Sequence, residues 1–478
     1  MSTHSPIRLP VLRPLALVAS LLLGACAQLP ELAAGPQIKP AEAWASSQSL
    51  AAPVQDWPVE TWWQSYGDSQ LNSLILEAVD GAPSMRVALA RLRRAEAAVQ
   101  TANAANGPQL NGNLSITEEK QSYNYLTPRS SLPQGWNDYG RATLDLSWEL
   151  DFWGRNHAAL AAASSEREAQ RAEAAQARLV LSASISSAYA ELARQFAAHD
   201  TTVAALEVRS KTAKLMRERF DNGMETLGAV RQAEARQASA RGDVLALEEQ
   251  IALQRNQLAA LMGAGPDRGL SIQRPSIELN RTPGLPPQLA LNLLGRRPDV
   301  VAARLRAEAA ASRIDGAKAE FYPNVNLTAF IGVQSLGLDK LGKSGSDTGS
   351  VGPAISLPIF SSGRLQANYR SRHADYDEAV ANYDSTVTQA LHDVADAATS
   401  QRALGAQLAS ANQAVEAARQ AWQIARNRYE GGLSTYLDVL SAEDSLLSNL
   451  RSLTDMQSRA FSLDVALIRA LGGGYRLS

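Results

Sequence analysis

Cysteine and histidine, which commonly act in catalysis or bind metals, are scarce in this chain, and their spacing suits neither role. The sequence has one cysteine among 478 residues, and its five histidines are far apart: His4, His157, His199, His373 and His392. Zinc sites need ligands at short, regular spacings, which these histidines do not have. No G-x-S-x-G element is present either. The sequence therefore predicts that the protein is not an enzyme and holds no metal.

The single cysteine has a context that indicates a covalent modification. Arg8 and Arg13 precede the apolar run PLALVASLLLGA, which is too short to span a bilayer and is typical of an export signal. The run ends in LGAC, which resembles the bacterial lipobox, where the cysteine thiol takes a diacylglyceryl group. We expect residues 1–25 to be removed and Cys26 to carry diacylglycerol and an N-acyl chain, with no other cofactor. Ala27, in place of aspartate, favours the outer membrane; the alternative is an ordinary signal with a chance cysteine.

Composition favours a helical protein that does not bind nucleic acid. The formal net charge is −2, 45% of the residues are hydrophobic and 6% are aromatic. Alanine is abundant, and small side chains allow helices to pack closely. At this charge and hydrophobicity, neither a nucleic-acid partner nor general disorder is expected.

The chain contains an internal duplication. A shift of 209 positions places RFDNGMETLGAVRQAEA (219–235) on RYEGGLSTYLDVLSAED (428–444), and it also places the Gly-Arg pair at 154 on the pair at 363. A chance match would not keep one register over so long a stretch, so the repeat decides the architecture. We expect the following organisation: a signal (1–25), a lipidated N-terminal segment (26–66), a first repeat (67–265), a linker (266–297), a second repeat (298–472) and a tail (473–478).

Each repeat is expected to contain two β-strands. Apolar and polar residues alternate with a period of two in four segments: 109–117, 141–150, 324–333 and 350–360. An ordinary half-buried sheet would show the same alternation. However, four strands of about ten residues in a helical chain have the length of tilted membrane-spanning strands. Such a sheet must close into a barrel with other copies, and the polar segments between its strands are expected to be extracellular loops.

Long helices make up the rest of each repeat. A helix is expected to open just after Pro83 and Pro298, because proline is tolerated in the first turn. A second helix of about 65 residues, or ~100 Å at the standard rise, should run from the Gly-Arg pair to a glycine break. A partner helix then returns to about Leu261 or Leu471, so each repeat ends in a long antiparallel helical hairpin.

The segments LDLSWELDFWGR, RRPDVVAARLRAEAA, AKAEFYPNVNLTAFIG and RYEGGLSTYLDVLSAED resemble the signature stretches of TolC-like outer-membrane efflux channels. The resemblance covers nearly the whole mature chain and is to the lipoprotein branch that works with RND pumps. It implies a homotrimer, with a twelve-stranded β-barrel of four strands per chain continued by an α-helical coiled-coil tunnel in the periplasm. It also implies two partners, an inner-membrane RND pump and a periplasmic adaptor, and the export of drugs or other small toxic compounds.

The resemblance also assigns roles to residues at the two glycine breaks, which would be the periplasmic tips of the hairpins. The residues expected to contact the adaptor are Gly223, Met224, Glu225, Thr226, Gly432, Leu433, Ser434 and Thr435. Hairpin loops without any partner are the alternative. The arginines that flank the breaks are expected to be solvated: Arg217, Arg219, Arg426 and Arg428.

A pore constriction is implied just after the second break. Asp438 resembles the acidic ring of relatives, in which three carboxylates near the axis would attract cations. Ser441 stands where many relatives have a second acid, so a double ring is not expected. Tyr429 matches a residue that holds the closed state in relatives, and Ser434 stands where they can have a locking arginine. A solvated surface aspartate is the alternative for Asp438.

Two other functions remain open at this stage. A non-transporting coiled-coil lipoprotein of the envelope would explain the helices but does not need four amphipathic strands. A type I protein-secretion conduit would have the same architecture, and the lipobox and the RND-type motifs favour small-molecule export over it. Trp62 and Trp63 resemble the family's N-terminal tryptophan pair and are expected to pack in a belt with the 266–297 linker.

Overall fold

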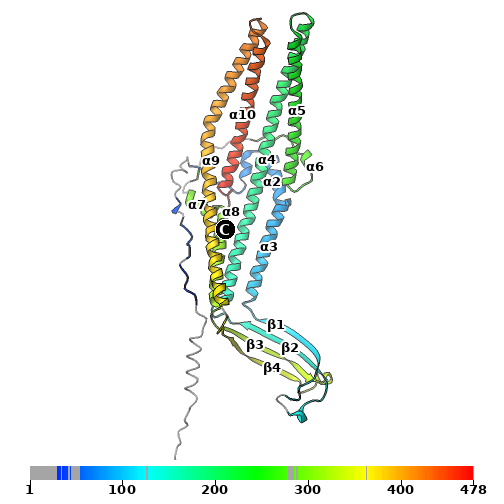
Figure 1. Ribbon diagram of the computed structural model, residues 1–478, viewed down its shortest axis with the longest axis vertical. Coiled ribbons are helices and arrows are strands. Elements are labelled where there is room, and N and C mark those ends of the chain that lie inside the picture. The colour runs from blue at the N-terminus through cyan, green and yellow to red at the C-terminus, as the bar shows by residue number, and fades with distance from the viewer. Residues whose placement is uncertain are drawn as a thin grey trace, which may run out of the picture. The chain divides into compact units, whose positions relative to one another are not determined.

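The computed structural model describes residues 29–33, 35–40, 43–44, 54–124, 128–277, 285–286, 289–361 and 363–476 (Figure 1). Cys26 and the expected export signal lie outside this part of the chain. The chain divides into two compact units. The first comprises Met1–Gln37, Arg93–Ala169 and Arg304–Asn382, and the second comprises Ile38–Leu92, Gln170–Ala303 and Tyr383–Ser478. Each unit therefore combines segments from both repeats.

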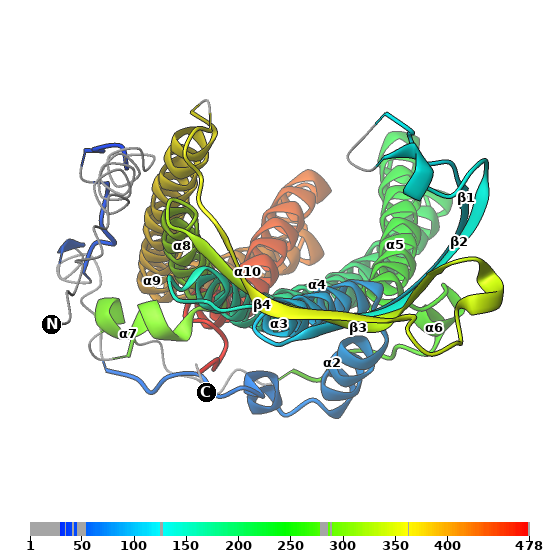
Figure 2. The same cartoon turned by 90° about the horizontal axis from the view of Figure 1, so that it is seen from below.

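The first unit contains a four-stranded antiparallel sheet in the order β1-β2-β3-β4. Its strands are β1 (Gln109–Glu119), β2 (Asn137–Glu149), β3 (Asn324–Leu336) and β4 (Asp347–Ser356). Figure 2 shows the sheet as a curved layer. The fourth strand differs from the expected 350–360, since it starts and ends earlier. Its last paired residue, Ser356, lies opposite Asn324, so β4 ends where its partner β3 begins.

The helices repeat with nearly the same lengths in both halves. The long helices α4 (Arg155–Asp221) and α9 (Arg364–Glu430) have 67 residues each, and their partners α5 (Leu227–Leu261) and α10 (Tyr436–Ala470) have 35 each. The helices α3 (Pro83–Ala104) and α8 (Pro298–Ala319) begin at the two prolines, as the sequence predicts. Among the described helices, none has an apolar stretch that could cross a bilayer.

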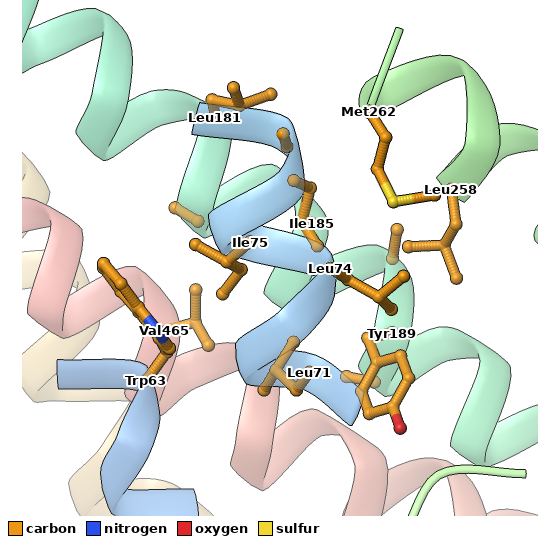
Figure 3. Close-up of a cluster of buried hydrophobic side chains, with 14 of the residues drawn as sticks. Trp63, Leu71, Leu74, Ile75, Leu181, Ile185, Tyr189, Leu258, Met262 and Val465 are labelled. Carbon is orange, nitrogen blue, oxygen red and sulfur yellow. The ribbon is translucent and has the colours of Figure 1, made fainter. Parts of the chain in front are cut away.

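A hydrophobic core in the second unit fixes one end of the helical hairpins. The short helix α2 (Ser69–Gly81) inserts Leu71, Leu74 and Ile75 between side chains of α4 and α5 (Figure 3). Trp62 and Trp63 of the 3-10 helix η2 (Trp62–Tyr66) are both 1% exposed and belong to the same core. Both tryptophans are therefore packing residues, as expected.

The segments before and between the repeats contact each other and the first repeat. Val54 and Leu285 form a parallel β-bridge, and the helix α7 (Leu289–Arg296) follows it. The short helix α6 (Asp267–Leu270) follows α5. Asp68 caps α2 and also accepts hydrogen bonds from the Tyr189 hydroxyl at 2.8 Å and the Ser276 backbone N–H at 2.8 Å. Burial disfavours the charge of Asp68, but these hydrogen bonds hold the pKa of its carboxyl below the usual value.

Candidate functional site

The two hairpin turns have the same backbone structure. Gly223 and Gly432 have φ angles of 72° and 70°, in the left-handed region that favours glycine. In each turn, the next residue donates its N–H to a carbonyl five residues earlier: Met224 to Arg219 at 2.8 Å and Leu433 to Arg428 at 2.8 Å. This is a common way for a helix to end. Figure 1 shows both turns at the same end of the second unit.

The helices that follow the two turns begin differently. Thr226 caps α5, because its hydroxyl accepts the Ala229 N–H at 3.2 Å. At α10, the Asp438 carboxylate accepts both the N–H and the hydroxyl of Thr435, each at 3.0 Å. A carboxylate at this place also interacts favourably with the helix dipole. Asp438 is exposed, and exposed Ser441 lies three residues further along α10, on the same side of the helix.

Both turns expose apolar side chains. Met224 and Leu433, which are equivalent in the two repeats, are 61% and 74% exposed. Leu437 in the first turn of α10 is also mostly exposed. Such apolar side chains at a surface are typical of a contact with another protein.

Tyr429 joins the two hairpins close to the turns. Its ring packs against a cluster that includes Met216 and Val230 of the first hairpin, and its hydroxyl donates to the Glu225 carboxylate at 3.4 Å. Burial raises the pKa of Tyr429, so its hydroxyl stays protonated and can donate. Tyr436 lies 5.5 Å from it, ring to ring, and burial raises the pKa of Tyr436 to about 12.

Other residues near the turns differ from the expectation. Arg219 is only partly solvated, since its guanidinium lies 5.3 Å from the Tyr429 ring and its Nε is buried. Arg217 binds Glu234 at 2.6 Å. Both arginines are held by neighbours because α5 and the second hairpin pack next to them. The Ser434 hydroxyl is buried and has no hydrogen-bond partner in the described part of the chain.

One group of charged residues was not identified from the sequence. Arg209 of α4, Arg236 of α5, and Glu443 and Asp444 of α10 form a network that we name the inter-hairpin ion cluster. The only sequence signal was the presence of charges on helix faces, which is common on solvated helices. Their pairing depends on contacts between residues more than 200 positions apart.

The described residues contain no group of three or more His, Cys, Asp or Glu side chains that could hold a metal ion. Residues 337–344 (GLDKLGKS) match the P-loop pattern G-x-x-x-x-G-K-S. A phosphate-binding P-loop must connect a strand to a helix N-terminus. This segment instead connects β3 to β4, and the Lys343 ammonium binds Asp339 at 3.1 Å, so the match carries no function.

The sheet has one apolar and one polar face. Residues paired across the strands share a face: Leu114 pairs with Ala142, which pairs with Val333, whereas Asn113 pairs with Thr143. Large apolar side chains on the first face are more than half exposed, namely Leu110, Leu114, Ile116, Leu144, Ile331, Val351 and Ile355. The other face carries polar groups, among them Asp145, which accepts from Asn113 at 2.8 Å and from Thr143 at 2.7 Å. This combination suits a sheet with lipid on one side and water on the other.

Comparisons with known proteins agree with these features. The family model of the outer membrane efflux protein matches residues 74–264 and 289–473. The multidrug resistance outer membrane protein MdtQ of Escherichia coli O6:H1 is 30% identical over 465 residues, which cover 95% of this chain and 96% of MdtQ. The fusaric acid resistance protein FusA of Burkholderia cepacia is 37% identical over 367 residues, which cover 75% of this chain and 68% of FusA.

Solved structures share the fold. The outer membrane protein VceC of Vibrio cholerae has a TM-score of 0.83 and 52% identity, with 87% of this chain and 100% of VceC covered. The outer-membrane channel OprN has a TM-score of 0.81 and 29% identity, with 94% of this chain and 98% of OprN covered. These findings confirm the family, the fold class and the outer-membrane location predicted from the sequence. The chain therefore belongs to the outer membrane efflux protein family and is an outer-membrane efflux channel.

Proposed function

We propose that three copies of the chain close a twelve-stranded barrel and form the passive exit duct of a tripartite efflux system. The observation that carries this proposal is the apolar face that continues over all four strands of the sheet. Within the described residues, the outer edges of β1 and β4 have no partner strand. Lipid does not tolerate open edges, so further copies must pair with them.

The turns at Gly223 and Gly432 are the proposed docking points of a periplasmic adaptor, which connects the duct to an inner-membrane RND pump. The exposed Met224 and Leu433 support this role, since equivalent apolar side chains on both turns offer the same contact twice. Drugs or other small toxic compounds are the proposed cargo, in keeping with the names of MdtQ and FusA. Acyl chains on Cys26 would anchor the chain to outer-membrane lipid.

Asp438 is the proposed pore constriction. Three copies of its carboxylate around one axis would favour cations and disfavour anions. Ser441 supplies no charge, so a single ring is proposed. Tyr429 and Ser434 are the proposed closed-state residues, of which Tyr429 acts through Glu225.

Planar-bilayer recording of the purified, lipidated protein tests this function. Asp438→Asn is the appropriate variant, because asparagine can still accept the hydrogen bonds from Thr435 and preserve the start of α10. We expect a small, cation-preferring conductance in the wild type and a loss of the cation preference in Asp438→Asn. Glu430→Gln, which removes an exposed acid on the other side of the same turn, is the control and should keep the preference.

Three outcomes would contradict the proposal. A folded protein that behaves as a monomer in detergent would exclude the shared barrel. A folded trimer that never conducts, even when substitutions disrupt the turns at Gly223 and Gly432, would favour a non-transporting envelope scaffold. Secretion of a protein substrate with unchanged drug sensitivity in a deletion strain would favour the type I conduit.

A further inference from the structure

The polar face of the sheet carries one arginine. Arg141 of β2 is the only lysine or arginine in the four strands. It shares its face with Thr143 and Asp145, since side chains alternate along a strand, and the large apolar side chains lie on the other face. In membrane barrels, charges are costly on the lipid face, whereas residues of the lumen face affect selectivity. In the proposed barrel, Arg141 therefore faces the lumen.

The neighbours of Arg141 leave its charge without an acidic partner. Ser115 of β1 and Gln334 of β3, which lie directly opposite Arg141, are both uncharged. Asp145, further along β2 on the same face, accepts its hydrogen bonds from two neutral side chains instead. Within the described part of the chain, the Arg141 guanidinium makes no hydrogen bond and no ion pair, and its one contact of this kind is with an aromatic ring. Its N–H groups are therefore available to a solute.

Phe330 of β3 provides that ring. The Arg141 guanidinium lies 5.2 Å from the centre of the Phe330 ring, within the range of a cation–π interaction. On the same face of β3, Gly332 lies between Phe330 and Gln334, the residue opposite Arg141. A Cβ on Gly332 would collide with the backbone of β2, so this position has no room for a side chain. The Arg141 side chain can therefore extend across Gly332 to the ring, which fixes the guanidinium.

This pair offers two kinds of contact to a solute in the lumen. A guanidinium stays charged, and its planar fork of N–H groups matches the two oxygens of a carboxylate. The Phe330 ring beside it is partly exposed, and aromatic rings pack favourably against one another. A solute that has both a carboxylate and an aromatic ring can use both contacts at once. Neutral and cationic solutes can use only the ring.

The second repeat lacks an equivalent of this arginine. The shift of 209 positions places Ser350 of β4 at the position of Arg141. Ser350 is exposed and lies directly opposite Phe330 on the same face of the sheet. Each chain therefore contributes one arginine to the lumen face of its strands, and a symmetric trimer would hold three at one level of the barrel.

We propose that Arg141 and Phe330 form a subsite for aromatic carboxylates inside the barrel, so that the exit duct favours anionic organic cargo. Arg141 is the specificity-determining residue, because it supplies the charge and the planar fork. Phe330 holds the guanidinium and contacts the ring of the cargo. The subsite has the opposite sign to the proposed Asp438 ring, so experiments can separate their effects. The inference rests on the proposed barrel and names a class of cargo for it.

Binding of 2-naphthoate to the purified, lipidated protein in detergent tests the subsite. Saturation-transfer difference NMR detects weak binding of such a probe during a titration. We expect Arg141→Gln to weaken binding about fivefold, in keeping with the strength of exposed charge pairs. Arg141→Lys keeps the charge but not the fork and should weaken binding less, and Phe330→Leu should also weaken it. Equal binding by the wild type and Arg141→Gln would overturn the inference.

A neutral probe is the control for the role of charge. The amide 2-naphthamide has the same ring system as 2-naphthoate but no negative charge. We expect it to bind the wild type and Arg141→Gln equally, because only the ring contact is left. If Arg141→Gln weakened the binding of both probes to the same extent, Arg141 would have a merely structural role, which contradicts the proposed subsite.

Reversal potentials in planar bilayers provide an independent measurement. Arg141→Gln removes a positive charge from the lumen and should increase the preference for cations, whereas Asp438→Asn should decrease it. Ser350→Arg adds a second arginine opposite Phe330 and should shift the preference toward anions. This gain cannot come from a misfolded protein. Unchanged potentials in both Arg141→Gln and Ser350→Arg would count against the subsite.

The outcomes for the duct and for the subsite differ. A wild type that is a monomer would contradict the shared barrel, and with it the subsite. A conducting trimer with equal 2-naphthoate binding in the wild type and Arg141→Gln would keep the duct and remove only the subsite. If Arg141→Gln forms no trimer, Arg141→Lys should bind 2-naphthoate more weakly than the wild type and Ser350→Arg more tightly. Equal binding by these three proteins would likewise refute the subsite.

Discussion

The two helical hairpins are alike in backbone and different in how they are held. Their helices have the same lengths, and their turns have the same glycine conformation and the same hydrogen bonds. Yet the equivalent residues Glu234 and Glu443 have opposite surroundings: the first is a partly exposed member of its own hairpin, and the second is buried against the other hairpin. The local sequence thus determines the backbone of each hairpin, and long-range contacts determine whether its glutamate binds its own hairpin or the other one.

The different surroundings of the two glutamates have different energetic consequences. An ion pair within a hairpin adds little, because both side chains remain hydrated. A pair across a buried interface makes separation of the two surfaces costly, since neither charge can remain there alone. Both repeats have the acid, but its partners differ, so it makes a local contact in the first repeat and connects two hairpins in the second.

The largest expected effect concerns the arginine partners of the two glutamates. Arg209→Met leaves Glu443 buried without its partner and should destabilise the contact by about 3–5 kcal/mol. Arg217→Met removes the pair with Glu234, in which both side chains are more than a third exposed, and should cost far less, because both charges stay hydrated. Hydrogen exchange of the α10 amides in detergent measures the difference. Equal exchange in the two variants would show that the buried pair does not hold the hairpins together.

The two turns should respond equally to the loss of glycine. A Cβ at Gly223 or Gly432 would meet no atom within 4 Å, so only the left-handed backbone is penalised in Gly223→Ala and Gly432→Ala. We expect each variant to be destabilised by about 1–2 kcal/mol. Thermal unfolding followed by circular dichroism provides the measurement. A clearly larger loss at Gly432 would mean that the second turn bears a constraint from outside its hairpin.

The smallest expected effect concerns how stability depends on pH. The two glutamates should contribute to this dependence in opposite directions. Burial raises the pKa of Glu443, so its contribution to stability is present below its unfolded pKa and is lost as pH rises through the folded pKa. Hydrogen bonds from Arg231 and Arg217 lower the pKa of Glu234, so its contribution is present above its unfolded pKa and is lost as pH falls through the folded one.

Glu443→Gln and Glu234→Gln should therefore change the pH dependence of unfolding in opposite directions. The wild type should become more stable toward acid pH as Glu443 takes up a proton. Glu443→Gln should lack this increase, because glutamine does not titrate. Glu234→Gln should lose stability that the wild type has above the ordinary glutamate pKa of 4.5. Denaturant unfolding of both variants and the wild type at a series of pH values measures the two effects. Changes of the same sign would contradict the difference in surroundings on which the comparison rests.

Much of the fold could be predicted from the sequence because its signals are local. Pro83 and Pro298 start helices since proline fits the first turn, and Gly223 and Gly432 end them since glycine has no Cβ. The alternation of apolar and polar residues predicted the strands and their two faces. The predicted end of β4 was wrong by four residues, because the alternation alone does not show that its partner β3 begins at Asn324, opposite Ser356.

The sequence by itself therefore determined the elements, the duplication and the family of this channel. Only the tertiary structure decided which charged residues meet. Arg209 and Glu443 are 234 residues apart, and nothing near either of them in the sequence distinguishes a buried ion pair from two solvated charges. The tertiary structure likewise placed the Tyr429 hydroxyl at the Glu225 carboxylate, 204 positions away in the sequence. The physical reason is that burial and the partner of a charge depend on which helices pack side by side, and helix packing is a property of the whole fold.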